Sequence, residues 1–360
     1  MQRIANYGSW LQAYALKSIL QSLGHRVQFA DYHTAGGGTS VRGKLHKASE
    51  ILGLDAPLSH RIGYIRFKQQ FASRYHAGLG LSPQPDYAPR TDVLVIGSDE
   101  VFNCTQANPD AGYSPELFGA GNRADKVITY AASFGNTTPE KLEKTGKTEE
   151  VARLLGQIPA ISVRDKSSGD MIRFLTGRTV PVHLDPTLIW DFSCSPSLFR
   201  ARHPQDYLLV YAYAGRISRA ESLSIQHYAR QNNLQIWSAG GILSCADRFI
   251  NCPPLELLSY FADAQAVVTD TFHGTILSVI TRRPFAALVR SSRDGSYGNE
   301  EKLSDLLSRL ALTGRQAKSA DEIPDILNCP IDYGPTAQII KAGRASALEY
   351  LARETGRDAL

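Results

Sequence analysis

The sequence predicts an α/β protein with two lobes, each built around a parallel β-sheet. Three observations predict this class. Short apolar runs of strand length alternate with helical patterns along most of the chain. The alternation pauses at residues 193–204, a stretch rich in serine, proline and polar residues, and then begins again. The length of 360 residues suits two domains or one large domain.

The first half of the chain opens with an amphipathic helix at 11–23, in which Leu11, Leu16 and Leu20 share one side. Gly24 ends this helix. The other elements predicted in this half are, in order, a strand at 26–30, a helix at 62–75, strands at 92–96 and 126–131, a helix at 148–156, a strand at 160–163, a helix at 168–175 and a strand at 180–184.

The second half repeats the alternation and ends in a long helix. Its predicted elements are a strand at 207–212, a helix at 219–231, a strand at 234–238, a helix at 254–262, a strand at 266–269, a helix at 275–281, a strand at 285–289, a helix at 301–310 and a last helix at 337–355. We therefore predict a Rossmann-like N-terminal lobe at 1–195, a Rossmann-like C-terminal lobe at 196–335 and a C-terminal helix at 336–360. Two such lobes leave a cleft between facing strand ends, which is a common ligand site.

The start of the chain departs from this plan. Residues 1–8 lead directly into the first helix, whereas a parallel lobe normally places a strand ahead of it. Either the lobe starts with its helix, or the chosen start is internal to a longer natural chain.

Composition limits the possible partners. The net charge of +4 is mild, and nucleic-acid binding would need Lys and Arg clustered along one face, so no nucleic-acid partner is expected. No apolar run is long enough to span a bilayer and no signal peptide is visible. The five cysteines are scattered without a CxxC pair, which argues against a disulfide framework or a zinc site and favours a reducing, cytoplasmic location: Cys104, Cys194, Cys245, Cys252 and Cys329.

The stretch 266–275 carries the most informative residue, His273. It lies between the end of a buried strand and the start of a helix. Open α/β sheets bind ligands at such strand ends, and helix N-termini favour anions. A histidine there could meet an anionic substrate and move a proton. The alternative is a helix-capping or core histidine.

Polar residues also follow other predicted strands. Gly97, Ser98 and Asp99 close the strand at 92–96, where Gly97 would permit close backbone approach and Ser98 could donate to phosphate or sugar. Asp99 could orient a hydroxyl or act as a base, although Ser and Asp are also common helix N-caps. Arg164 follows the strand at 160–163, and its planar fork suits a carboxylate or phosphate unless it simply pairs with a surface acid. Asp185 could contact substrate or form the turn that Asp-Pro favours.

Six short segments together carry a family resemblance, although each is weak alone. They keep a consistent order along the chain, at 6–16, 95–103, 130–135, 162–165, 184–187 and 269–274. In this order the sequence resembles the polysaccharide pyruvyl transferases, nearly from end to end. The resemblance implies a glycosyltransferase-B-like pair of Rossmann-type domains.

The resemblance also implies an activity: transfer of the enolpyruvyl carbons of phosphoenolpyruvate onto a sugar of a cell-surface polysaccharide precursor. The products would be a pyruvate ketal and phosphate. Arg164 looks like the family's donor-binding arginine and His273 like its catalytic histidine. Asp99 is the second catalytic candidate. The other residues expected to contact substrate are Gly97, Ser98, Thr271, Gly274, Asn6, Gln12, Asp185 and Arg290.

One position departs from the family pattern. Many members carry an arginine two positions before the histidine, whereas this chain has Thr271. A second cation for the donor must then come from elsewhere, and Arg290, Arg293 and Lys302 are the candidates in the following loops.

The expected partners are phosphoenolpyruvate as donor substrate and a lipid-linked or nucleotide-linked sugar acceptor, with no metal and no cofactor. The presumed acceptor makes peripheral membrane association plausible, although the sequence offers no basic amphipathic helix that argues for it. Two other functions stay open. One is a nucleotide-sugar glycosyltransferase on the same fold, and the other is a non-catalytic glycan- or anion-binding relative.

Overall fold

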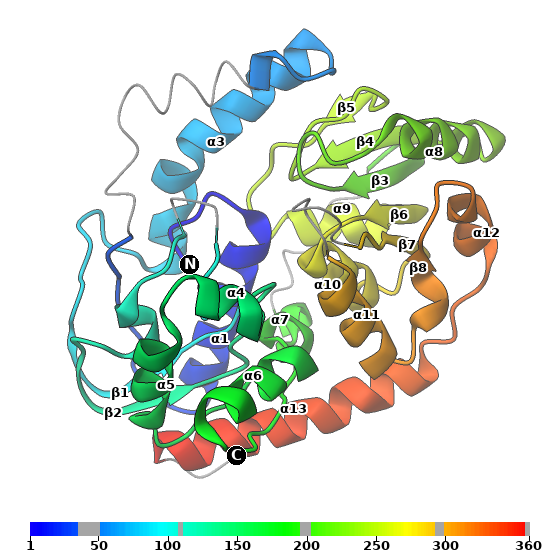
Figure 1. The fold of residues 1–360 in the computed structure, drawn as a ribbon. Coiled ribbons are helices and arrows are strands. Elements are labelled where there is room, and N and C mark those ends of the chain that lie inside the picture. Colours follow the sequence, from blue (N-terminus) through cyan, green and yellow to red (C-terminus); the bar gives the residue numbers. More distant parts are fainter. Residues whose placement is uncertain (35–50, 107–110, 195–202, 292–298, 357–360) are drawn as a thin grey trace.

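The computed structural model describes residues 1–34, 51–106, 111–194, 203–291 and 299–356. Within them, two parallel sheets lie in different halves of the molecule, and helices cover them (Figure 1). The predicted α/β class with two parallel-sheet lobes and a C-terminal helix is therefore confirmed. The predicted lobe boundary at 195/196 lies outside the described residues.

The C-terminal half contains a six-stranded parallel sheet in the order β5-β4-β3-β6-β7-β8. Strands β3, β6 and β7 are buried along their whole length, as expected of apolar strands covered on both faces. The order reverses between β3 and β6, so a crevice is expected at the carboxyl ends of these two strands. The strands are β3 Tyr207–Tyr211, β4 Gln235–Ala239, β5 Arg248–Phe249, β6 Ala266–Thr269, β7 Phe285–Leu288 and β8 Gln316–Ala317.

Within the described part of this half, five helices accompany the sheet. The sequence predicted four of them and missed α12, and it also missed the two-residue strands β5 and β8, which are too short for a periodic signal. The helices are α8 Arg219–Gln231, α9 Leu257–Asp263, α10 Phe272–Ile280, α11 Glu300–Arg309 and α12 Glu322–Asn328, with a 3-10 turn η4 at Thr313–Arg315.

The N-terminal half has a smaller sheet, in which β1 (Arg90–Ile96) pairs in parallel with β2 (Arg123–Thr129). Single parallel bridges continue the sheet from β2 to Ala160, and from Val163 to Val182. The strands predicted at 160–163 and 180–184 therefore lie in sheet positions but form isolated bridges instead of full ladders. The helices of this half are α1 Tyr7–Ser22, α3 Leu58–Leu79, α4 Pro139–Lys144, α5 Thr148–Gly156, α6 Lys166–Thr176 and α7 Pro186–Ile189, with 3-10 turns η1 Pro115–Phe118 and η2 Phe192–Cys194.

Two further predictions in this half need correction. Residues 26–30 form no strand, because they have no ladder partner among the described residues, and a cavity separates them from β1. Helix α1 begins at Tyr7 instead of Leu11, because the Asn6 side chain caps it by accepting from the N–H groups of Gly8 and Ser9.

The two halves are joined by a shared core and by helix α13 (Gly334–Thr355), which runs along the base of the molecule back to the N-terminal half (Figure 1). The Tyr350 hydroxyl of α13 donates to the Thr129 carbonyl over 2.9 Å, and Lys126 Nζ lies 2.9 Å from a Glu354 carboxylate oxygen. These contacts attach α13 to strand β2 of the N-terminal sheet.

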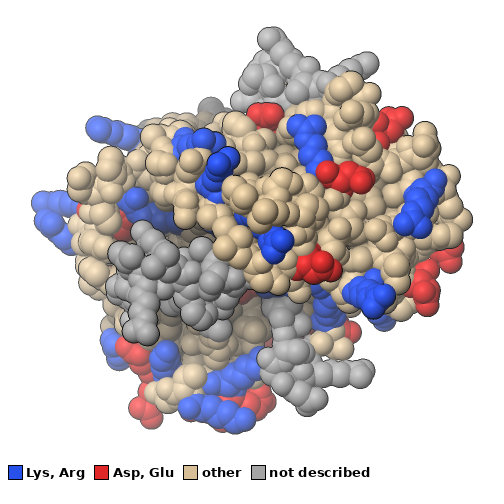
Figure 2. Space-filling view, turned by 90° about the horizontal axis from the view of Figure 1, so that it is seen from above, with Lys and Arg blue, Asp and Glu red and all other residues tan. Residues whose placement is uncertain are grey.

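On the face seen from above, Lys and Arg side chains are scattered, with Asp and Glu side chains among them (Figure 2). Among the described residues, no helix combines the length and the apolar character needed to cross a bilayer.

Candidate functional site

The turn after β1 forms one wall of the site. Gly97 has φ of 124°, and a Cβ there would come within 2.2 Å of the Tyr130 carbonyl oxygen, so only glycine fits. Ser98 is buried, and its Oγ donates to the Ala131 carbonyl over 2.8 Å and to Asp185 Oδ2 over 3.1 Å. The turn therefore carries Ser98 and Asp99 toward the loop that contains Asp185.

Arg164 lies at the centre of this wall. Its side chain is 2% exposed, and its Nη1 lies 3.3 Å from Asp185 Oδ2 and 3.5 Å from Asp99 Oδ1. Its guanidinium sits 4.1 Å from the centre of the Phe272 ring. Burial lowers the pKa of Arg164, but Asp99 and Asp185 outweigh burial and raise it, so the group stays charged. The Arg164 Nε atom is buried without a hydrogen-bond partner.

The surface alternative for Arg164 is wrong. Its neighbour Asp165 instead caps α6, where it accepts from the Ser168 N–H over 2.9 Å. Asp185 has the expected turn role, because one of its oxygens accepts from the Thr187 N–H to begin α7, while its other oxygen faces Arg164 and Ser98.

The His273 side chain approaches the Asp185 carboxylate from the C-terminal half. It is the second residue of α10, which starts at the reversal point between β3 and β6. Its Nε2 lies 3.8 Å from Asp185 Oδ2 and has no hydrogen-bond partner, although the side chain is only 11% exposed. Arg164 and His273 thus approach one carboxylate oxygen from different halves of the molecule.

Asp99 is held ionised within this cluster. Burial alone would raise its pKa, but the positive charges of His273 and Arg164 outweigh burial and lower the pKa to about 2. Ser9 of α1 adds a hydrogen bond from its hydroxyl to Asp99 Oδ2 over 3.1 Å. A pKa this low keeps Asp99 ionised at neutral pH, where it can accept a hydrogen bond from a hydroxyl, but it makes the carboxylate a weak base.

The remaining predicted residues form two groups. Asn6, Thr271 and Gly274 surround the cluster: Asn6 Nδ2 donates to the Tyr213 hydroxyl over 2.8 Å, and Thr271 Oγ1 caps α10 by accepting from the Gly274 N–H over 2.9 Å. Gln12 lies farther along α1, where it is buried and lines a cavity beside β1.

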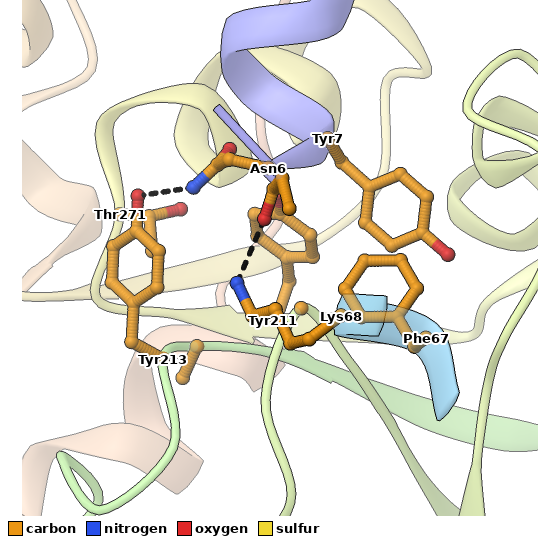
Figure 3. A pocket seen from close by; sticks show the side chains of 10 residues that line it. Asn6, Tyr7, Phe67, Lys68, Tyr211, Tyr213 and Thr271 are labelled. Carbon is orange, nitrogen blue, oxygen red and sulfur yellow. Dashed lines mark hydrogen bonds between the residues drawn. The ribbon is translucent and has the colours of Figure 1, made fainter. Parts of the chain in front are cut away.

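Figure 3 shows the region where Asn6 meets the C-terminal half. Its side chain points at the Tyr213 hydroxyl, with Thr271 close by, while Lys68 of α3 donates to the Ala5 carbonyl over 2.7 Å. The space enclosed there is only about 10 Å³, so the side chains nearly fill it.

The structure separates the three candidates for the second cation. Arg290 is engaged by Asp270 and Glu221, at 3.1 and 2.9 Å. Lys302 of α11 reaches Glu100, the neighbour of Asp99, at 2.9 Å. Arg293 lies outside the described residues.

Sequence reasoning missed three residues of the cluster: Gly8, Ser9 and Phe272. A Cβ on Gly8 would come within 2.5 Å of His273 Nδ1, so this glycine lets α1 approach the imidazole. The sequence offered one clue to each of two of these residues. Phe272 is adjacent to His273, and Ser9 directly follows the Asn-Tyr-Gly segment. Neither signal says which way a side chain points. The described residues contain no group of three or more His, Cys, Asp or Glu side chains that could hold a metal.

Fold and site together define a two-lobed α/β protein with a buried arginine, a histidine and two carboxylates at the junction of its lobes. The chain belongs to the polysaccharide pyruvyl transferase family, whose sequence profile matches residues 6–292. It is accordingly a transferase, and the two parallel-sheet lobes with a returning C-terminal helix are the glycosyltransferase-B-like arrangement that the resemblance implied.

Among solved structures, the chain is similar to a putative UDP-N-acetylglucosamine 2-epimerase from Listeria monocytogenes, with 10% identity, a TM-score of 0.46, and coverage of 74% of this chain and 76% of that one. It is also similar to the UDP-GlcNAc 2-epimerase from Neisseria meningitidis bound to UDP-GlcNAc, with 12% identity, a TM-score of 0.45, and coverage of 94% and 96%. Similarity at this level supports no conclusion about activity. No curated protein matches the sequence.

Proposed function

We propose that the protein transfers the pyruvyl group of phosphoenolpyruvate onto two hydroxyls of a sugar as a ketal and releases phosphate. One observation carries the proposal. Arg164 and His273 lie beside the same Asp185 carboxylate from opposite halves of the molecule, and each has a buried nitrogen without a hydrogen-bond partner, Nε in Arg164 and Nε2 in His273. Phosphoenolpyruvate carries a carboxylate and a phosphate, and such donors bind these anions.

The reaction assigns a role to each group. Arg164 holds the donor, with Phe272 stacked on its guanidinium. His273, as the acid, gives a proton to the methylene carbon, which becomes a methyl group while the adjacent carbon becomes electrophilic. Asp99 orients the attacking sugar hydroxyl and takes its proton as the new carbon–oxygen bond forms and the hydroxyl becomes acidic. The carbon–oxygen bond to phosphate then breaks, the second hydroxyl closes the ring, and its proton leaves with the phosphate.

Lys302 is the residue we propose as the second cation in place of the usual arginine. Its partner Glu100 directly follows Asp99, so the ammonium is held near the cluster from α11. Arg290, which two carboxylates already engage, is less suited to bind a donor. Thr271 cannot supply the charge, and its hydroxyl is committed to capping α10.

The carrier of the acceptor sugar is proposed to be a lipid. Helix α3 carries Arg61, Arg66, Lys68 and Arg74 and no acidic residue. Leu58 and Ile62, four positions apart and therefore on one face, are exposed. A basic helix with exposed apolar residues is the basis on which we propose peripheral association with an anionic membrane surface. The free cysteines among the described residues fit a reducing, cytoplasmic location.

The decisive experiment measures phosphate release from phosphoenolpyruvate across a panel of acceptor glycans. The wild-type protein should release phosphate only when an acceptor is present. His273→Gln should lower turnover about 100-fold or more, because general acid catalysis is lost. His227→Gln, at an exposed position of α8, is the matched control and should keep full activity.

A thermal-shift measurement separates the competing functions. Phosphoenolpyruvate should raise the Tm, since a ligand that binds only the folded state stabilises it. A rise with nucleotide sugars but not with phosphoenolpyruvate would favour the glycosyltransferase alternative. Binding without acceptor-dependent phosphate release would favour the non-catalytic one.

A further inference from the structure

Helix α11 belongs to the C-terminal half but contacts the N-terminal half along one face. Its apolar face packs into the shared core through Leu303, Leu306 and Leu307, which are buried. Lys302, Asp305 and Arg309 follow one another at spacings of three and four residues, so they lie together on a second, polar face.

The polar face of α11 reaches the segments that carry Asp99 and Arg164. Arg309 Nη1 donates to the Arg164 carbonyl oxygen over 2.5 Å, although the two residues are 145 positions apart. Lys302 makes the same crossing near the start of the helix, where its Nζ lies 2.9 Å from Glu100. One helix of the C-terminal half therefore contacts both segments.

Asp305 contacts the turn after Arg164 as well. Its carboxylate accepts a hydrogen bond from the Lys166 backbone N–H. Asp305 Oδ2 and Arg309 Nη1 are 3.7 Å apart, so the two side chains also pair with each other. Together this acceptor and this donor meet the N–H and the carbonyl oxygen of the two peptide groups that flank Asp165.

The backbone at Arg164 has few other supports. Residues 160–163 form isolated bridges instead of a full ladder. The Arg164 N–H donates to the Ala132 carbonyl over 3.0 Å. The Arg164 carbonyl precedes the N-cap of α6, so it takes no part in the hydrogen bonds of that helix. The contact with Arg309 therefore satisfies a carbonyl group that lies between a strand position and a helix.

Ordinary helix stabilisation does not account for this contact. A basic residue in the last turn of a helix interacts favourably with the helix dipole, and a pair four residues apart adds a few tenths of a kcal/mol. Arg230 has such a position in the last turn of α8, and it is exposed. Arg309 has the same position in α11, but its side chain is only 26% exposed and its guanidinium reaches the other half of the molecule.

We propose that Arg309, together with Asp305, is a positioning residue that holds the Arg164 backbone so that its guanidinium keeps the orientation needed for the donor. This inference rests on the proposed function, which assigns phosphoenolpyruvate to Arg164. A guanidinium binds an oxyanion through a planar fork, so a small rotation of its backbone moves both N–H donors off their acceptors. Arg309 acts on the donor only through Arg164.

The first test needs no ligand and follows amide hydrogen exchange in peptides that cover 164–168. Arg309→Gln removes the cation and shortens the side chain, so exchange there should become about tenfold faster or more than in the wild type. Arg309→Lys keeps a charged donor and should restore most of the protection. Arg230→Gln, the matched control in the last turn of α8, should leave exchange unchanged.

The second test is a double-mutant cycle on donor binding, measured by calorimetric titration. Arg309→Gln should weaken phosphoenolpyruvate binding about tenfold with little change in Tm. In the Arg164→Lys background the same substitution should weaken binding about twofold or less, since a lysine ammonium is a point charge on a flexible stem. A merely structural role would give equal losses in both backgrounds. All variants are compared above pH 6.5, because Arg309 also lowers the pKa of His183.

The outcomes separate this inference from the proposed function. Unchanged exchange in Arg309→Gln would overturn the positioning role, and so would equal weakening of donor binding in the two backgrounds. Faster exchange with normal donor binding would overturn it too. A wild-type protein that does not bind phosphoenolpyruvate would contradict the proposed function, and exchange in 164–168 would still decide whether α11 holds this turn.

Discussion

At the scale of single residues, Arg164 depends on neighbours from four separated segments. The carboxylates of Asp99 and Asp185 pair with its guanidinium, and the Phe272 ring lies against the same group. Arg309 donates a hydrogen bond to the backbone carbonyl oxygen of Arg164. The sequence marked Arg164 because it follows a predicted strand and matches a family segment. It did not reveal that the side chain is buried, because burial depends on α10 arriving from more than a hundred residues away.

Arg164→Lys tests what the guanidinium contributes beyond charge. A lysine keeps the positive charge near Asp99 and Asp185 but lacks the planar fork and cannot stack in the same way. We expect donor binding to weaken about tenfold or more, which is a loss of about 1.4 kcal/mol. Calorimetric titration with phosphoenolpyruvate measures this.

Arg164→Ala is the informative comparison. It leaves two buried carboxylates without their cation, so unfolding free energy should fall by about 3–5 kcal/mol. If the alanine variant were as stable as the wild type and the lysine variant bound the donor normally, the central role of Arg164 would be wrong.

At the scale of elements, the site exists because α1 and α10 approach closely at their N-termini. Both helices are capped by a side chain, Asn6 in one and Thr271 in the other. Capping of α10 also explains Thr271, the position where the family pattern has an arginine. The sequence predicted both helices but started them four and three residues late, because caps and first turns carry little periodic signal.

Gly8→Ala tests this approach. The added Cβ would fall within 2.5 Å of the His273 ring, so the imidazole or α1 must shift. Alanine is the better helix former, so a defect cannot come from helix propensity. We expect turnover to fall at least about tenfold, since small misplacements of catalytic groups are costly.

Gly78→Ala is the matched control for this substitution. It lies in α3 with open space around it, and it should leave turnover unchanged and stability equal or slightly higher. Full activity of Gly8→Ala would show that His273 does not need its observed position.

At the scale of the whole molecule, α13 ties the C-terminal half to the N-terminal sheet and buries His183 beneath it. The His183 ring lies 4.8 Å from that of Tyr350, and its Nδ1 is 2.7 Å from the Ser162 hydroxyl. Burial, followed by the charges of Arg309 and Arg353, lowers the His183 pKa from 6.5 to about 4.

This shift predicts how stability depends on pH. The folded state keeps His183 neutral below pH 6.5, whereas the unfolded chain binds a proton there, so stability should fall as pH drops from 6.5 to about 4. The loss is at most roughly 3 kcal/mol. His183→Gln should flatten this part of the stability curve in urea unfolding series, and His227→Gln should not. An unchanged slope in the His183 variant would contradict the assignment.

The sequence by itself determined the alternation of strands and helices, the split into two parallel-sheet lobes, and the polar residues that follow the strands. These features depend on local periodicity and turn chemistry, which each segment carries within itself. The tertiary structure decided which of those polar residues meet: Arg164, Asp99, Asp185 and His273 converge, while Arg290 and Gln12 do not. Convergence follows from strand order and from the contact between α1 and α10, which join distant segments, and no local pattern encodes such contacts.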